Sequence, residues 1–80
     1  NILDYVDLTT EIAIYELAVP ESWYGNSIIE KSVRTHYQIS ILATKKDEQI
    51  YPLPHPDHIF AKDETLIVMG KADSIKNLTK

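Results

Sequence analysis

The sequence contains no cysteine, and this absence removes several kinds of chemistry at once. Disulfide bonds, zinc–thiolate sites and thiol nucleophiles are all excluded. No apolar run is long enough to span a bilayer, and no signal-peptide pattern is present. The 80 residues suffice for one small domain. This composition fits an intracellular protein. Because residue 1 is Asn and not Met, we expect a segment of a longer protein.

Net positive charge is also missing, since 8 Lys and Arg stand against 12 Asp and Glu. A general nucleic-acid binder normally carries positive charge or a broad basic face, so we expect no DNA or RNA partner. The charge is unevenly placed. Residues 1–24 hold five acids and no base, whereas residues 25–46 hold four bases and one acid. The basic segment is either ordinary surface scatter or a small anion site.

The motifs of common enzyme classes are absent as well. The sequence has no G-x-S-x-G and no P-loop, and its three histidines lack an evident nucleophile partner. We therefore predict that the domain is not an enzyme and uses no catalytic cofactor. His55, Asp57 and His58 could ligate a metal ion. They lie on a proline-rich loop without a clear fourth ligand, so we predict no metal site.

Hydrophobic patterning predicts an α+β domain with the element order βαβββα. Residues 1–10 are expected to be a linker or a lead-in strand. Residues 11–19 alternate as a strand, with Ala13, Tyr15, Leu17 and Val19 on one face. The turn that follows carries Trp23 and Tyr24, which we expect to pack as a small core beneath it.

Ser27 and Glu30 match a capping box and predict a helix over residues 28–35. Ile29 and Val33 are four residues apart and should share its buried stripe. Further strands are expected at residues 38–44, 49–51 and 65–69, with a polar turn at residues 45–48. A stiff proline loop should span residues 52–56. A last helix, capped by Asp73 or Ser74, should bury Ile75 and Leu78.

The segment from Asn26 to Ile41 could form a ligand slot. A helix and the strand it feeds normally pack together, which would gather their aliphatic side chains into a flat apolar surface. Arg34 and His36 would lie at its rim, where a guanidinium gives bidentate contacts to phosphate. Such a slot suits a nucleobase with its phosphate. The alternative is that the aliphatic side chains are core and that Arg34 and His36 complement the helix dipole.

Two stretches of the sequence resemble a known family. They are IAIYELAVPESWYGNSI (residues 12–28) and VRTHYQISILATKKDEQIYPLPHPDHIFAKDETLIVMG (residues 33–70). Together they are similar to the RCK C-terminal domain, or TrkA-C domain, of bacterial potassium transport regulators and cation/proton antiporters. The resemblance covers about residues 11–78. It implies the fold βαβββα and a two-fold homodimer.

The resemblance also implies a context and a function. Residues 11–80 would be a cytoplasmic regulatory domain that follows an RCK N-terminal domain and controls a transporter in the cell membrane. Several relatives bind the second messenger cyclic di-AMP at the dimer interface. The lack of a Gly-Ile-Asn triplet before the apolar strand core favours an antiporter over a potassium uptake system. A ligand-free structural dimerisation domain is the alternative.

The implied ligand positions come from the helix, the returning strand and the proline loop. They are Ile28, Ile29, Arg34, Ile39, Ile41, Pro54 and Pro56. His36 is an added polar candidate. Ser40 stands where relatives often have Asn, and it offers a shorter hydroxyl toward phosphate.

Overall fold

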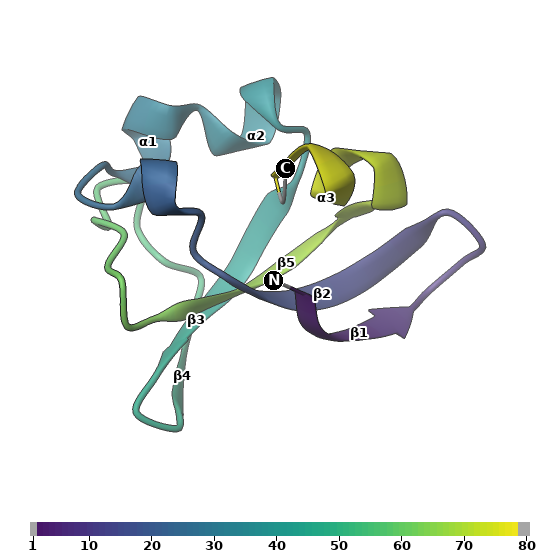
Figure 1. The fold of residues 1–80 in the computed structure, drawn as a ribbon, viewed down its shortest axis with the longest axis horizontal. Helices are drawn as coiled ribbons and strands as arrows, with labels where there is room; N and C mark the ends of the chain where they lie inside the picture. The colour runs from purple at the N-terminus through teal and green to yellow at the C-terminus, as the bar shows by residue number, and fades with distance from the viewer. Residues whose placement is uncertain (1, 79–80) are drawn as a thin grey trace.

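The computed structural model describes residues 2–78, which form one antiparallel sheet with the helices on one of its faces (Figure 1). The strands are β1 (Ile2–Asp7), β2 (Ile12–Ala18), β3 (Ser40–Lys46), β4 (Gln49–Pro52) and β5 (Thr65–Lys71). The helices are η1 (Glu21–Trp23), α1 (Ile28–Lys31), α2 (Val33–His36) and α3 (Ala72–Leu78). The sheet order is β1-β2-β5-β3-β4. From β2 onward, the predicted α+β fold and its element order are confirmed.

The alternation predicted for β2 is confirmed. Its inward side chains are almost fully buried, with Tyr15 8% exposed and Leu17 0% exposed. On the opposite face Glu16 interrupts the half-buried apolar residues. Its carboxylate accepts a hydrogen bond from the Thr65 hydroxyl at 3.1 Å and pairs with Lys45 Nζ at 3.5 Å. A charge at this position is tolerated because β5, which pairs with β2, and β3, the next strand beyond it, each supply a partner.

Residues 2–7 form a strand, which is one of the two structures expected for the start of the sequence. β1 pairs antiparallel with β2 and extends the sheet at its edge. Its side chains are exposed, and Tyr5 stacks on Tyr15 with the ring centroids 6.1 Å apart. Because the side chains of β1 are exposed, this strand is held mainly by its hydrogen-bond ladder and by this aromatic pair.

The capping box is confirmed, but the helix that it begins is broken. Ser27 N–H donates to Glu30 Oε1 at 2.8 Å, and Glu30 N–H donates to Ser27 Oγ at 3.1 Å. Ser32 then adopts a left-handed conformation (φ 48°), so residues 28–36 form two four-residue turns. The predicted common stripe is therefore wrong: Ile29 is 63% exposed, while Val33 is 2% exposed. The left-handed residue between them redirects the chain.

The hairpin between β3 and β4 is tighter than predicted. Asp47 and Glu48 alone make the turn, with φ of 52° and 65°, and both values suit a type I′ turn. Lys45 and Lys46, which we expected in the turn, belong to β3. The strand predicted from residue 38 begins at Ser40 because Gln38 has φ 59°. β4 ends at Pro52, where the missing N–H stops the ladder.

The core lies between the sheet and the helices. Trp23 is 1% exposed and packs against Tyr37 and Phe60, with ring centroids 5.0 Å away in each case. The predicted aromatic core beneath the turn is confirmed for Trp23, whereas Tyr24 is 38% exposed.

The C-terminal helix closes the other end of this core. Ile75 and Leu78 are buried as predicted. β5 runs past its predicted end, through Gly70 to Lys71, and α3 follows at once from Ala72. Asp73 therefore lies in the first turn of the helix and not before it, so the predicted cap is wrong. An acidic residue in the first turn still complements the helix dipole.

Candidate functional site

A small slot lies where three segments of the chain meet. It has a volume of about 180 Å³. Its walls are the turns α1 and α2, the start of β3 and the proline loop, and they contribute Ile28, Val33, Arg34, Ile39, Ser40, Ile41, Pro54 and Pro56. The first half of β3 is open to this slot because β4 pairs only with residues 43–46.

The slot has an aliphatic floor and a cationic rim. Val33 and Ile39 are each 2% exposed and form part of the core beneath the slot. Arg34 is exposed, and within residues 2–78 no carboxylate lies in ion-pair distance of its guanidinium. A flat apolar surface next to an uncompensated guanidinium is suited to an aromatic base that carries a phosphate.

A shallower hollow adjoins the slot along the outside of the two helical turns. Its volume is about 370 Å³. Ile28, Val33, Arg34 and Pro56 line both concavities, and the hollow adds Ile29, Ser32 and Thr35. The exposed side chain of Ile29 therefore lies beside the slot and not inside it.

The structure brings seven of the nine predicted positions together around the slot; Ile29 and His36 are the other two. His36 lines neither concavity, and its ring packs edge-on against Tyr37 at a centroid distance of 4.7 Å. Val33 was missed because its spacing assigned it to the core alone. Val33 does belong to the core, and it also lines the slot.

Backbone hydrogen bonds attach the proline loop to the start of α1. Ile28 N–H donates to the His58 carbonyl at 3.1 Å, and Ile29 N–H donates to the Pro56 carbonyl at 3.0 Å. These are amides of the first helical turn, which have no partner within the helix. Two walls of the slot are thus directly connected.

The capping box fixes the same end of α1. Glu30 accepts the Ser27 backbone N–H and, as a smaller effect, a hydrogen bond from the Ser27 hydroxyl. These bonds hold the pKa of Glu30 below its ordinary value of 4.5, because they favour the ionised carboxylate.

The histidines of the proline loop have separate partners in the described part of the chain. His55 and Asp57 pair with each other at the exposed tip, where Nδ1 lies 3.5 Å from Oδ2. The Asp57 N–H donates to the same His55 nitrogen at 3.1 Å. His58 turns away from both, and residues 2–78 contain no group of three His, Asp or Glu placed to hold a metal ion.

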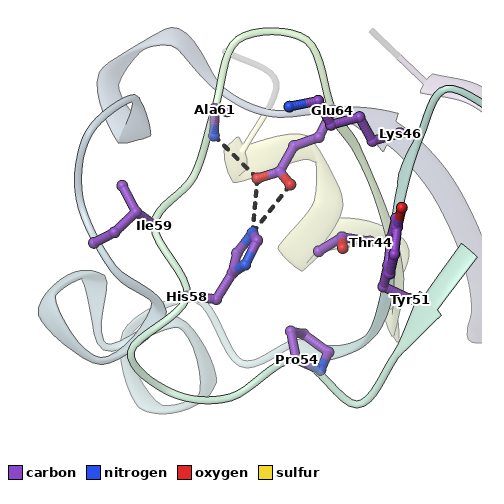
Figure 2. Close-up of a pocket in the computed structure, with 8 residues that line it drawn as sticks. All are labelled: Thr44, Lys46, Tyr51, Pro54, His58, Ile59, Ala61 and Glu64. Carbon is purple, nitrogen blue, oxygen red and sulfur yellow. Dashed lines mark hydrogen bonds and ion pairs between the residues drawn. The ribbon is translucent and has the colours of Figure 1, made fainter.

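His58 instead contacts Glu64 at the back of the proline loop, in a second pocket of about 360 Å³ (Figure 2). Its Nε2 lies 3.0 Å from each carboxylate oxygen of Glu64. Pro54 lines this pocket and also the slot. Sequence reasoning missed the pair because the two residues are six apart across a turn with no regular periodicity.

Comparison with known proteins gives a consistent result. The TrkA-C domain profile matches residues 12–80. Two curated relatives from Bacillus subtilis (strain 168) are Ktr system potassium uptake protein A, 37% identical over 76 residues, and protein C, 28% identical over 80 residues. The matches cover 95% and 100% of this chain. The chain spans only about a third of the length of each relative, 34% and 36%.

Solved structures share the fold. The KtrA RCK C domain in complex with cyclic diadenosine monophosphate superposes with a TM-score of 0.74 and 30% identity, covering 80% of this chain and 75% of that one. The GsuK RCK domain gives 0.71 and 27%, covering 85% of this chain and 15% of that one. None of the helices in residues 2–78 has the length and apolar character needed to cross a bilayer. From the profile match and these similarities, the chain belongs to the TrkA-C, or RCK C, domain family.

Proposed function

We propose that this domain is the ligand-binding regulatory part of a bacterial potassium uptake protein and that it binds cyclic di-AMP in the slot. The observation that carries the proposal is Arg34, whose guanidinium has no ion-pair partner in residues 2–78 and lies at the rim of an apolar slot. The similar KtrA RCK C domain has been solved in complex with this nucleotide. Similarity to two potassium uptake proteins favours that class of parent protein over an antiporter.

The volume of the slot supports a dimeric site. Pockets for small molecules commonly measure about 300–1,000 Å³. One slot of about 180 Å³ falls below this range, and two such slots reach its lower part. A two-fold dimer presents the same residues twice about its axis, and cyclic di-AMP has the same symmetry. Each Arg34 would contact one phosphate, and each aliphatic floor would receive one adenine.

Ser40 is the position at which the contacts would differ from those of relatives with Asn. Its hydroxyl reaches less far than a carboxamide and donates one hydrogen bond instead of two. Pro54 and Pro56 would enclose the base from the loop side. His36 lies outside the slot, so it is not part of the proposed binding set.

Regulation requires that the nucleotide bind two states of the parent protein with different affinity. The domain would act from the cytoplasmic side, together with an upstream RCK N-terminal domain and a membrane-embedded transporter. Binding at an interface between two copies would favour whichever transporter state holds those copies at the spacing the ligand needs.

The test is calorimetric titration of the protein with cyclic di-AMP. We expect binding with one nucleotide per two chains, weaker binding of cyclic di-GMP, and no comparable heat with ATP. Absence of heat with cyclic di-AMP would contradict the proposal.

The hollow beside the slot favours a second function, ligand-free dimerisation, because Ile28, Ile29 and Pro56 line it together and Ile29 is 63% exposed, and a contiguous apolar surface of this kind suits a protein contact. In that case the chain would dimerise without nucleotide, and its melting temperature would not respond to the ligand.

A further inference from the structure

Glu64 is a buried carboxylate with few possible partners. Its side chain is 4% exposed, and Lys46, the nearby cation in the same pocket, pairs with Asp63 at 3.4 Å. Its oxygens accept the Ala61 N–H at 3.0 Å and face His58 Nε2, also at 3.0 Å. A buried carboxyl group must be hydrogen-bonded, and the partners that this geometry gives it are the Ala61 N–H and the imidazole of His58.

His58 connects this buried group to the slot. Its imidazole points toward Glu64 (Figure 2), while its backbone carbonyl accepts the Ile28 N–H at 3.1 Å. Ile28 is the first residue of α1 and lines the slot. His58 therefore connects Glu64 to the wall of the slot: its side chain contacts the Glu64 carboxylate, and its backbone carbonyl binds Ile28.

The neighbouring residues repeat the same attachment. Phe60 N–H donates to the Asn26 carbonyl at 2.9 Å, and Gly25 N–H donates to the Phe60 carbonyl at 3.0 Å. Ser27 and Ile59 form an isolated antiparallel bridge. The chain after the proline loop thus lies against the entry to α1 over several residues. A shift of the His58 backbone would move Ile28 directly, because the two residues are joined by a backbone hydrogen bond and not through a flexible side chain.

We propose that Glu64, acting through His58, is a positioning residue that sets the separation between α1 and the proline loop. This inference rests on the proposed function insofar as that separation is the width of a nucleotide slot. Glu64 and His58 touch no ligand in this proposal. They keep α1 and the proline loop, the two walls that would contact the ligand, at a fixed separation.

The substitutions at each position separate hydrogen bonding from packing. His58→Gln keeps an N–H at the place of Nε2, whereas His58→Phe keeps the ring shape and removes the donor. Glu64→Gln keeps a polar group that can pair with both Ala61 and His58, whereas Glu64→Met keeps the length and removes both acceptors. If the two side chains only fill space, Phe and Met are tolerated at least as well as Gln. If they act through their hydrogen bonds, the Gln variants are tolerated better than the Phe and Met variants.

The first measurement is amide hydrogen exchange without ligand. We expect the Ile28 and Ile29 amides to exchange at least about tenfold faster in His58→Phe and Glu64→Met, because local opening sets their protection. The Gln variants should stay within about threefold of wild type. Amides of the sheet core at Leu66 and Val68 should be unaffected. The matched control is Asp63→Asn, which changes the adjacent, exposed carboxylate and should leave Ile28 unchanged.

The second measurement is calorimetry with cyclic di-AMP on the same variants. The dissociation constant should rise about tenfold in the Phe and Met variants, where only about a tenth of the free protein would hold the separation that the ligand needs, and it should recover in the Gln variants. Unchanged Ile28 exchange in both Phe and Met variants, or equal acceleration at Ile28 and Val68, would overturn the inference. If wild type gives no heat, the proposed function fails, and the exchange data still decide whether Glu64 positions α1.

Discussion

Gly70 of β5 lies directly against Ile39, the residue that precedes β3. A Cβ atom on Gly70 would lie 2.8 Å from the Cγ2 methyl of Ile39 and 3.5 Å from its Cβ. Ile39 lines the slot, but its side chain is only 2% exposed and is packed in the core. It therefore has little room to move away from residue 70. Because residue 70 has no side chain, the side chain of Ile39 can pack closely against the backbone of β5.

Gly70→Ala should destabilise the domain and deform the slot. The added methyl must displace a buried side chain, and overpacking of this kind costs about 1–3 kcal/mol of unfolding free energy. Urea unfolding of both proteins measures the difference. Ile39→Leu removes the Cγ2 branch at equal volume, so the double variant should recover most of the loss. If Gly70→Ala is as stable as wild type, β5 and the segment that contains Ile39 can move apart without loss of unfolding free energy, which would contradict this prediction.

Arg34→Ala should weaken cyclic di-AMP binding about 10- to 100-fold, because a hydrogen bond to a charged group contributes about 1.5–3 kcal/mol. Arg34→Lys should recover only part of this, since an ammonium lacks the planar fork. Calorimetry gives the dissociation constants. Lys31→Ala removes a cation from the same helical segment without touching the slot and should bind like wild type. Equal losses in Arg34→Ala and Lys31→Ala would indicate a general charge effect.

Binding should also weaken as salt concentration rises. Contacts between Arg34 and phosphate are ionic and lie at an exposed rim, where the screening length falls from about 10 Å at 0.1 M to about 3 Å at 1 M. The dissociation constant measured over this range should increase for wild type and stay nearly flat for Arg34→Ala. An equally steep dependence in both proteins would place the phosphate at another cation.

The capping box makes stability depend on pH. The folded-state pKa of Glu30 is lowered because the ionised carboxylate accepts the Ser27 N–H. Its contribution is therefore complete above the ordinary value of 4.5 and is lost as the pH falls through the folded-state value. Glu30→Gln should lower the melting temperature at about pH 7, and the difference from wild type should shrink toward about pH 3. Glu21→Gln, at an exposed position outside the capping box, is the control.

The serine of the same motif gives a comparison that depends less on pH. Ser27→Ala should cost about 1 kcal/mol of unfolding free energy at neutral pH, as for other N-cap serines. Its effect should persist below about pH 4, because the hydroxyl still accepts the Glu30 N–H when the carboxylate is protonated. Identical pH profiles for Ser27→Ala and Glu30→Gln would contradict this division of the two hydrogen bonds.

Local chemistry was readable from the sequence, and tertiary geometry was not. The capping box needs only four consecutive residues, and the buried face of β2 follows from the two-residue period of a strand, so both were predicted correctly. The break at Ser32 carries no glycine or proline signal, so the local sequence does not predict its left-handed conformation. The contact of His58 with Glu64 depends on how a turn closes. The gathering of helix and strand residues into a slot was expected from the packing of a helix on the strand that it feeds, and the family resemblance added Pro54 and Pro56 of the proline loop.

The break at Ser32 has a thermodynamic consequence for any binding partner. It leaves Ile29 largely in water, so the domain folds without removing that apolar surface from solvent. A nucleotide or a second copy that covers Ile29 would bury this surface during association. Association of that kind has a negative heat-capacity change, so its enthalpy should become more favourable as the temperature rises.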